Sequence, residues 1–458
     1  MATSTSTKTT AEVEEEIDLN ELLHGASLEL DDHPEIVTAQ RVINCRCELG
    51  ECVLYDDVRH AVYFTDIYGR TFHRLQLGSS SADGDKTKKK ILYSAHRLPK
   101  KLCSFGLLEG GGAQQKKDGE DCSGQKQSSL PLLCAWEDGF QMYDVVAGVA
   151  LGGMSEGDDV NPNKGSTRLN DGRTDPTGHR FVCGGYYGGG GANNNKEKVF
   201  KVEQRRKGGG GGAGDAGEEM ELFHEPIVNE IQTTNSICWT LDGKRMYLAD
   251  SETREIHSYA YNVDGSGASS SILSDKKLLH EKPADDKCVP DGSCVDSQGY
   301  LWNAVWCTGE AKGMVVRIDP GTGHVVYTVH VPDLVSQVSC CCFGGTDLDI
   351  LFITTARDGR DAQVQPHAGA LYAARVPFKG RPESRLKFAV PAACAAEQKN
   401  VHEKEPSAAA DGDEGEQSST KRRASADAED GSNNSNNKNE AGDDDKEEQE
   451  RKKARSSS

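Results

Sequence analysis

The chain has 458 residues, 50 of them glycine, and a formal net charge of -20. Only 35% of the residues are hydrophobic, which is low for a fully folded chain, so part of the molecule should lack a packed core. The acidic balance argues against a general nucleic-acid-binding protein, because neutralising phosphates requires a basic face.

Residues 1–34 form an N-terminal extension that we expect to be mostly disordered. The extension starts rich in Thr and Ser, becomes acidic before Asp18, and lacks the apolar core of a secretory signal. No stretch of the chain approaches the ~20 consecutive apolar residues that a membrane-spanning helix needs. We therefore expect a cytoplasmic protein with no membrane partner.

Between residues 35 and 382, one pattern recurs six times: a short β-rich run, a turn and a second strand. The six hairpins are predicted at residues 61–75, 132–143, 180–202, 245–259, 301–318 and 350–374. Polar or Gly-rich loop insertions interrupt the pattern at residues 78–90, 109–129, 155–166 and 188–217. Without these insertions the period approaches the roughly 40–50 residues of propeller blades.

The repeat therefore predicts an all-β fold, a six-bladed β-propeller with disordered N- and C-terminal tails and Gly-rich loop insertions. Turn dipeptides such as Asp138-Gly139, Asp242-Gly243 and Asp291-Gly292 separate the predicted strands. A pair of β-sandwiches is the alternative architecture, but it predicts no sixfold repeat.

Residues 395–458 are predicted to form a disordered, charged, low-complexity tail, because they carry almost no large apolar side chains. Basic clusters at residues 421–423 and 451–455 resemble nuclear-import signals. If they act as such signals, a nuclear fraction should accompany the cytoplasmic one. A solvated polyampholyte with no targeting role is the alternative.

Fifteen cysteines are scattered along the chain, and several lie within apolar strand-like runs. Buried free thiols in a reducing compartment are the favoured interpretation, and disulfides are the alternative. Cys45 and Cys47 are too close together for a four-ligand zinc site without a second pair of ligands. Four isolated histidines are expected to have structural roles: His60, His73, His179 and His257.

Three oxygen-bearing side chains, those of Glu51, Asn235 and Asp291, precede the first, fourth and fifth hairpins at similar distances. Equivalent positions on different blades of a propeller converge on the central channel. A Glu, Asn and Asp set suits a hard cation such as Ca²⁺, Mg²⁺ or Mn²⁺, and it tolerates Zn²⁺. The alternative is that these are ordinary turn residues, since Asp and Asn before Gly are common for local hydrogen-bonding reasons.

Seven short motifs follow one another in a fixed order. They are LGECVLYD at 49–56, RLNDG at 168–172, DPTG at 175–178, Asn235 with WTLD at 239–242, PDGSC at 290–294, RIDP at 317–320 and CCFGG at 341–345. Together they resemble the senescence-marker-protein/gluconolactonase family, which includes the regucalcin-like proteins. The resemblance extends from about residue 36 to residue 380, apart from the insertions, and it implies a six-bladed propeller.

The resemblance also implies a role for each matching residue. Glu51, Asn235 and Asp291 would be metal ligands, with Asp291 also the catalytic acid/base, while Arg168 and Asn170 would bind the substrate. The implied activity is metal-dependent hydrolysis of a sugar lactone such as gluconolactone to the open-chain acid, via a metal-activated water. The cofactor would be one divalent cation (Ca²⁺, Zn²⁺, Mn²⁺ or Mg²⁺), and the enzyme is expected to be a monomer without a nucleic-acid partner.

Two other functions remain open at this point: a non-enzymatic calcium-binding or regulatory protein on the same fold, and a propeller that serves only interactions. The chain departs from the family where an acidic substrate contact is usual after the third-blade strand. Tyr186, Tyr187 and Gly188 stand there instead, so the particular lactone stays undetermined. No G-x-S-x-G motif is present, which argues against a serine-type lactonase.

Overall fold

The computed structural model describes residues 10–15, 36–78, 91–110, 129–157, 159–163, 165–188, 197–207, 220–263, 272–282, 287–309 and 312–390. Every regular element in these ranges is a β-strand, and none of the described residues forms a helix that could cross a bilayer. All of them belong to one compact unit, Met1–Val401. The predicted tail and its basic clusters lie outside the described residues.

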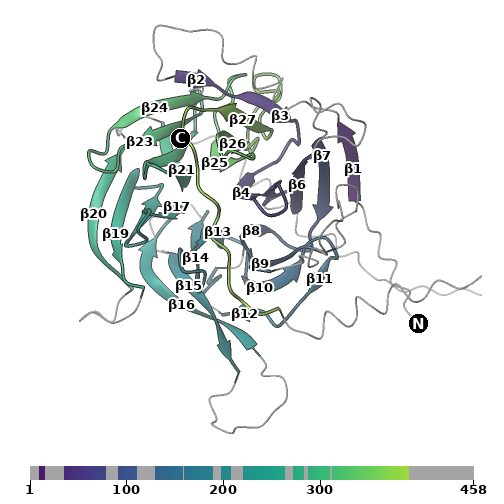
Figure 1. The fold of residues 1–458 in the computed structure, drawn as a ribbon, viewed down its shortest axis with the longest axis vertical. Helices are drawn as coiled ribbons and strands as arrows, with labels where there is room; N and C mark the ends of the chain where they lie inside the picture. Colours follow the sequence, from purple (N-terminus) through teal and green to yellow (C-terminus); the bar gives the residue numbers. More distant parts are fainter. Residues whose placement is uncertain are drawn as a thin grey trace, which may run out of the picture. The chain divides into compact units, whose positions relative to one another are not determined.

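Six sheets are arranged as blades around a common centre (Figure 1). The innermost strands of the blades, in chain order, are β4 (Gly50–Asp56), β8 (Leu102–Leu107), β13 (Thr167–Thr174), β17 (Thr234–Trp239), β21 (Cys288–Val295) and β25 (Val338–Gly344). The predicted six-bladed propeller is therefore confirmed.

The second and third strands of each blade coincide with the six predicted hairpins. They are β5 (Ala61–Asp66) and β6 (Thr71–Leu77), β9 (Pro131–Trp136) and β10 (Gly139–Asp144), β14 (Phe181–Tyr187) and β15 (Glu197–Arg206), β18 (Arg245–Asp250) and β19 (Glu255–Tyr261), β22 (Leu301–Cys307) and β23 (Met314–Ile318), and β26 (Ile350–Thr355) and β27 (Leu371–Arg375). The predicted insertion at 188–217 was too broad, because it contains the whole of β15.

The outer positions are more varied. They are occupied by β7 (Ile91–Arg97), β11 (Val149–Ala150), β12 (Ser155–Glu156), β16 (Met220–Ile231), β20 (Leu273–Glu281) and β24 (Val325–His330). Strand β1 (Thr10–Glu15), from the N-terminal extension, pairs antiparallel with β7 and adds a fifth strand to the first blade. Strand β12 lies inside the predicted insertion at 155–166.

The ring is closed by the segment that precedes the first blade. Strand β3 (Gln40–Ile43) pairs antiparallel with β27, so the sixth blade combines strands from both ends of the propeller. Strand β2 (Ile36–Thr38) pairs parallel with β24 of the fifth blade. This pairing hydrogen-bonds the two ends of the propeller to each other within one blade, which stabilises the ring against opening.

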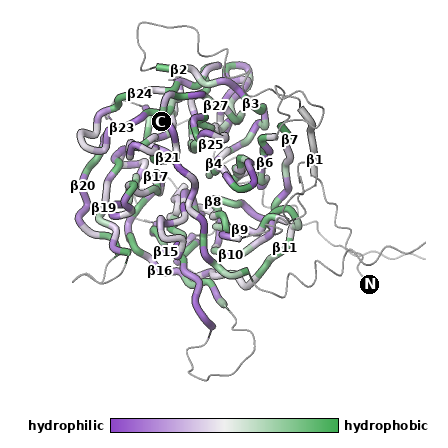
Figure 2. Tube along the Cα trace, in the orientation of Figure 1, coloured by the Kyte–Doolittle hydropathy of each residue, from purple (hydrophilic) through white to green (hydrophobic). Residues whose placement is uncertain are grey.

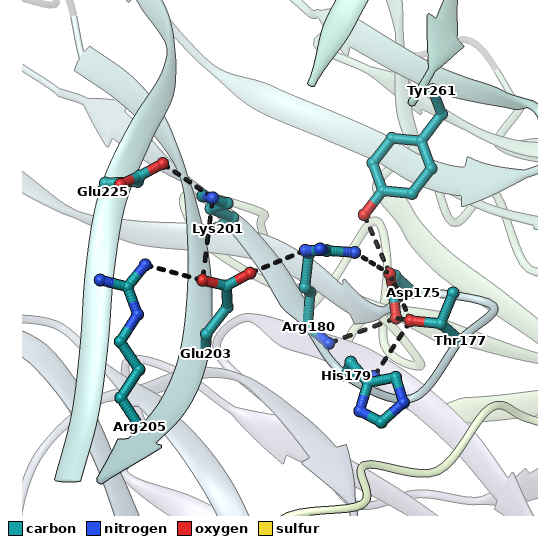
Figure 3. Close-up of polar contacts among 9 residues, drawn as sticks. All are labelled: Asp175, Thr177, His179, Arg180, Lys201, Glu203, Arg205, Glu225 and Tyr261. Carbon is teal, nitrogen blue, oxygen red and sulfur yellow. Dashed lines mark hydrogen bonds and ion pairs between the residues drawn. The ribbon is translucent and has the colours of Figure 1, made fainter. Parts of the chain in front are cut away.

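Hydrophobic residues recur along the strands of all six blades (Figure 2). Their buried side chains pack between neighbouring sheets. Trp136, Trp302 and Tyr372 are among the largest fully buried side chains. Polar bonds add to this packing at the junction of the third and fourth blades (Figure 3). There the Tyr261 hydroxyl donates a hydrogen bond to Asp175 over 3.0 Å.

A segment that we call the strap, residues 376–390, follows β27 and crosses the ring (Figure 1). It contacts the carboxyl-terminal ends of the innermost strands. Arg173 of β13 forms two hydrogen bonds with Glu383 of the strap, of 2.9 and 3.0 Å. Arg385 donates to Asp56 at the end of β4 over 2.7 Å. A small cavity between the strap and the inner strands is lined in part by Arg173, Trp239 and Glu383.

The cysteines follow the predicted pattern with one exception. Eleven described cysteines are free thiols, and all of them are buried except the partly exposed Cys45. Cys288 and Cys307 form a disulfide, so the expectation of thiols throughout was wrong for this pair. The physical reason is register, since the two residues lie directly opposite each other on β21 and β22.

Candidate metal centre

Four of the innermost strands contain a β-bulge at a site residue. The register shifts fall between Glu51 and Leu54 in β4, Leu169 and Gly172 in β13, Asn235 and Cys238 in β17, and Pro290 and Ser293 in β21. A bulge turns a side chain away from the regular alternation of a strand. The turn interpretation of these residues was therefore wrong, because Asp291 and Gly292 lie inside a strand.

Two of these bulges carry a residue with left-handed backbone geometry. Cys52, directly after Glu51, has a φ of 48°, and Ser236, directly after Asn235, has a φ of 62°. Non-glycine residues adopt this region at an energetic cost, which the surrounding structure must offset. For Ser236 part of that compensation is a 2.7 Å hydrogen bond from its hydroxyl to the backbone oxygen of Asp291. The strain therefore lies where two predicted ligands are positioned.

A chain of hydrogen bonds connects the third blade to the fourth. The Asn170 amide donates to the Asn235 side-chain oxygen over 3.1 Å and to the backbone oxygen of Thr234 over 2.8 Å. The Asn170 side-chain oxygen accepts a 2.5 Å hydrogen bond from Arg168. Both ends of the Asn170 amide are thus engaged within the protein. The hydrogen bonds of the Asn170 amide orient Arg168 and Asn235. Asn170 therefore has a positioning role in addition to its predicted contact with substrate.

The chain continues from the fourth blade to Asp291. The Asn235 amide donates to the Ser251 hydroxyl over 2.8 Å, and that hydroxyl donates to the backbone oxygen of Pro290 over 2.7 Å. Asn303 donates to the backbone oxygen of Asp291 over 2.9 Å. These bonds fix the Asp291 backbone and leave one oxygen of its carboxylate, Oδ1, free. Oδ1 of Asp291 is buried and has no hydrogen-bond partner among the described residues.

Three buried carboxyl groups belong to this centre: those of Glu51, Asp171 and Asp291. Burial, with the negative charge of Asp171 adding to it, raises the pKa of Glu51 to about 8. Burial and the charges of Glu51 and Asp171 hold the pKa of Asp291 well above its usual range. Burial also raises the pKa of Asp171. The protein alone therefore does not supply enough positive charge for these groups to ionise together.

A divalent cation fits this centre. Glu51, Asn235 and Asp291 offer oxygen atoms only, and the unpartnered Oδ1 of Asp291 is an acceptor that a cation would satisfy. A cation would also balance the carboxylates whose mutual repulsion raises their pKa values. The three predicted ligands are all nearly inaccessible to solvent, with exposed fractions of 9%, 4% and 5% respectively.

Asp171 is a member of this centre that the sequence-based prediction omitted. It is the fourth residue of the RLNDG motif, and its Oδ2 accepts a 2.9 Å hydrogen bond from the backbone N–H of Ile237. That bond joins the bulge of β13 to the bulge of β17. The sequence places this Asp directly after Asn170 and before Gly172. The motif alone does not show in which direction its carboxylate points.

Arg168 brings a positive charge to the rim of the centre. Its guanidinium lies over the ring of Tyr186, 4.3 Å from the centroid, and 5.4 Å from the ring centroid of Tyr68. Nε of Arg168 is buried without a hydrogen-bond partner in the described part of the chain. Stacking on aromatic rings holds the planar group in place while leaving donors for a ligand.

Comparison with known proteins identifies the family of this chain. Residues 49–357 match the family model described as SMP-30/gluconolactonase/LRE-like region. The chain belongs to this family. Regucalcin from Xenopus laevis is 31% identical over 338 residues, which cover 72% of this chain and 92% of that protein. Regucalcin from Sus scrofa is 30% identical over 216 residues, but this match spans less than two thirds of that protein, 64%, and 46% of this chain.

The same fold occurs in a solved structure of this family. A calcium-binding protein, regucalcin, from Agrobacterium tumefaciens superimposes with a TM-score of 0.54 at 20% identity, covering 77% of this chain and 99% of that one. At this identity the likeness establishes the propeller and nothing finer. The family assignment confirms the predicted resemblance, while the roles of the individual site residues remain predictions.

Proposed function

We propose that this family member is a metal-dependent lactonase that hydrolyses a sugar lactone to its open-chain acid. The observation that carries the proposal is the convergence of bulges from four blades on one buried, oxygen-rich centre. Glu51, Asn235 and Asp291 would hold the cation, which when bound would polarise the lactone carbonyl and acidify a water molecule. A protein that used the propeller only for interactions would not need strained backbone at these positions.

The residues around the centre have distinct tasks in the proposed reaction. The Asp291 carboxylate takes up a proton from the attacking water and returns it to the ring oxygen as the ester bond breaks. Arg168 pairs with negative charge that develops on the substrate and remains on the carboxylate product. Asn170 keeps the guanidinium of Arg168 at the distance set by their 2.5 Å hydrogen bond.

A lactone-hydrolysis panel with controlled metal content tests the proposal. Protein stripped with a chelator should lose nearly all activity, and adding back Zn²⁺, Mn²⁺, Mg²⁺ or Ca²⁺ one at a time should restore it to different extents. The control is the same panel with the turn variant Asp242→Asn, which changes an exposed residue. Full activity after verified removal of metal would refute the proposed mechanism.

The non-enzymatic calcium-binding alternative makes a different prediction. It requires the same three ligands but no proton transfer to or from a substrate. Calcium binding without turnover of any lactone in the panel would favour this alternative.

A further inference from the structure

A second cluster of potential metal ligands lies outside the centre described above. Among the described residues, ligand atoms of Cys47, Asp66 and His73 all lie within 4.8 Å of one another, and all three side chains are buried. The chemistry of this set differs from that of Glu51, Asn235 and Asp291, because it includes sulfur and nitrogen. Thiolate and imidazole ligands favour zinc over the hard cations that suit an all-oxygen site.

The imidazole of His73 is oriented as a ligand would be. Its Nδ1 lies 2.6 Å from the Tyr93 hydroxyl, and its Nε2 lies 3.5 Å from Sγ of Cys47. Zinc-bound histidines are commonly fixed by a hydrogen bond at the other ring nitrogen. In a tetrahedral zinc site the separation between a ligating sulfur and a ligating nitrogen is roughly 3.5 Å, which the observed distance matches. The ring is also stacked on Phe64, with 4.6 Å between centroids.

Two further groups lie beside this pair: the Asp66 carboxylate, which belongs to the set of three, and the Cys45 thiol, which is outside that set and adjoins Cys47. Oδ1 of Asp66 accepts hydrogen bonds from the backbone N–H groups of Leu49 and Gly69. Oδ2 accepts one from the backbone N–H of Glu48 over 3.0 Å, which leaves it a lone pair for a cation. Sγ of Cys45 lies 3.5 Å from Sγ of Cys47. The sequence showed Cys45 and Cys47 without a second pair of ligands, and the fold supplies that pair from β5 and β6.

We propose that Cys47, His73 and Asp66 hold a structural zinc ion and that Cys45, beside Cys47, turns toward it as the fourth ligand. The burial of Cys47, His73 and Asp66 closes the site to a substrate, which is typical of structural rather than catalytic zinc. Cys45 and Cys47 lie between β3 of the sixth blade and β4 of the first, whereas Asp66 and His73 belong to the first blade. A zinc ion there would fasten the ring-closing segment to the first blade.

The location also connects the cluster to the first centre. Cys47 lies four residues before Glu51, and Gly50 pairs with Asp66 across β4 and β5. Replacing Gly50 with a larger residue would bring its Cβ to 3.3 Å from Cβ of Cys47. The zinc cluster would therefore stiffen the backbone from which the Glu51 bulge begins, without contributing a ligand to that centre.

Cobalt substitution in the full-length, reduced protein tests this proposal. Co²⁺ bound to cysteine gives a thiolate-to-cobalt charge-transfer band in the near ultraviolet, which an all-oxygen site cannot give. We expect the band in the wild-type protein and its loss in both Cys47→Ser and His73→Gln. It should persist in Cys134→Ser, which removes a buried thiol elsewhere, and in Glu51→Gln, which affects the other centre.

The experiment therefore tests the zinc proposal separately from the proposed lactonase function. Lactonase activity is not the readout, so an inactive protein would still report on the thiolate site. Circular dichroism of each variant confirms folding, and His73→Gln provides a second test that leaves every thiol in place. Absence of the band from wild-type protein with verified free thiols would overturn the proposal, as would its persistence in both Cys47→Ser and His73→Gln.

Discussion

Replacing Asp291 with Asn is expected to lower lactone turnover by about 1000-fold or more, because the variant loses a proton-transfer group and a charged metal ligand together. The amide keeps the size of the side chain, so the hydrogen bonds of Ser236 and Asn303 to the Asp291 backbone should persist. Turnover at saturating metal and substrate, measured beside wild type, gives the loss directly.

Although Asp291→Asn should lower turnover, it should increase the stability of the metal-free protein. The folded state raises the pKa of Asp291 above its unfolded value, since burial and the charges of Glu51 and Asp171 oppose ionisation. Stability linked to this group is therefore lost as pH rises above the unfolded pKa. The Asn variant avoids that loss, so metal-free Asp291→Asn should unfold at a higher temperature than wild type at neutral pH.

Thermal unfolding with and without metal separates the two effects. Wild type should gain more stability from saturating metal than Asp291→Asn does, because only wild type supplies the full ligand set. The exposed-turn variant Asp242→Asn is the control and should gain as much stability from metal as wild type does. Equal turnover by Asp291→Asn and wild type would be incompatible with the assigned role.

Replacing Glu383 with Leu is expected to destabilise the propeller by roughly 3–5 kcal/mol, because it leaves the buried cation of Arg173 without its partner. The Arg173 and Glu383 side chains are 10% and 15% exposed, so solvent offers little compensation. Arg173 would keep its hydrogen bond to the backbone oxygen of Ser293, but not the two bonds to the strap. Urea unfolding followed by fluorescence measures the change.

The double variant Arg173→Met, Glu383→Leu is the matched control for this prediction. Removing both charges should recover much of the lost stability, since an apolar pair needs no compensation for burial. Metal affinity should change little in the double variant, because the charges of Arg173 and Glu383 act on Asp171 in opposite directions and both are removed. A loss below about 1 kcal/mol in Glu383→Leu would mean that the ion pair is not buried as described.

The sequence predicts the blades well because the second and third strands of each blade are regular. Runs such as residues 245–250 and 255–259 are short, β-rich and joined by turns, so all six copies can be recognised. The innermost strands are harder to predict, since bulges interrupt their alternation. Asp291-Gly292 has the composition of a turn, although the structure places it inside β21.

Most of the features that could not be predicted from the sequence depend on contacts between residues far apart in the chain. Asp66 and His73 lie 19 and 26 residues after Cys47, and no local spacing rule connects them. The disulfide between Cys288 and Cys307 depends on the register of β21 and β22. The direction of the Asp171 carboxylate depends on the bulge of β13. Such features follow from strand register and bulges, which residue patterns determine only weakly.

Anomalous diffraction from crystals soaked in Mn²⁺ would test the central claim most directly. Manganese prefers oxygen ligands, so it should select the all-oxygen centre over the thiolate cluster. We predict one strong peak within about 2.0–2.6 Å of side-chain oxygens of Glu51, Asn235 and Asp291, and its loss in Asp291→Asn. A peak elsewhere, or no peak among these three side chains at saturating metal, would contradict the account.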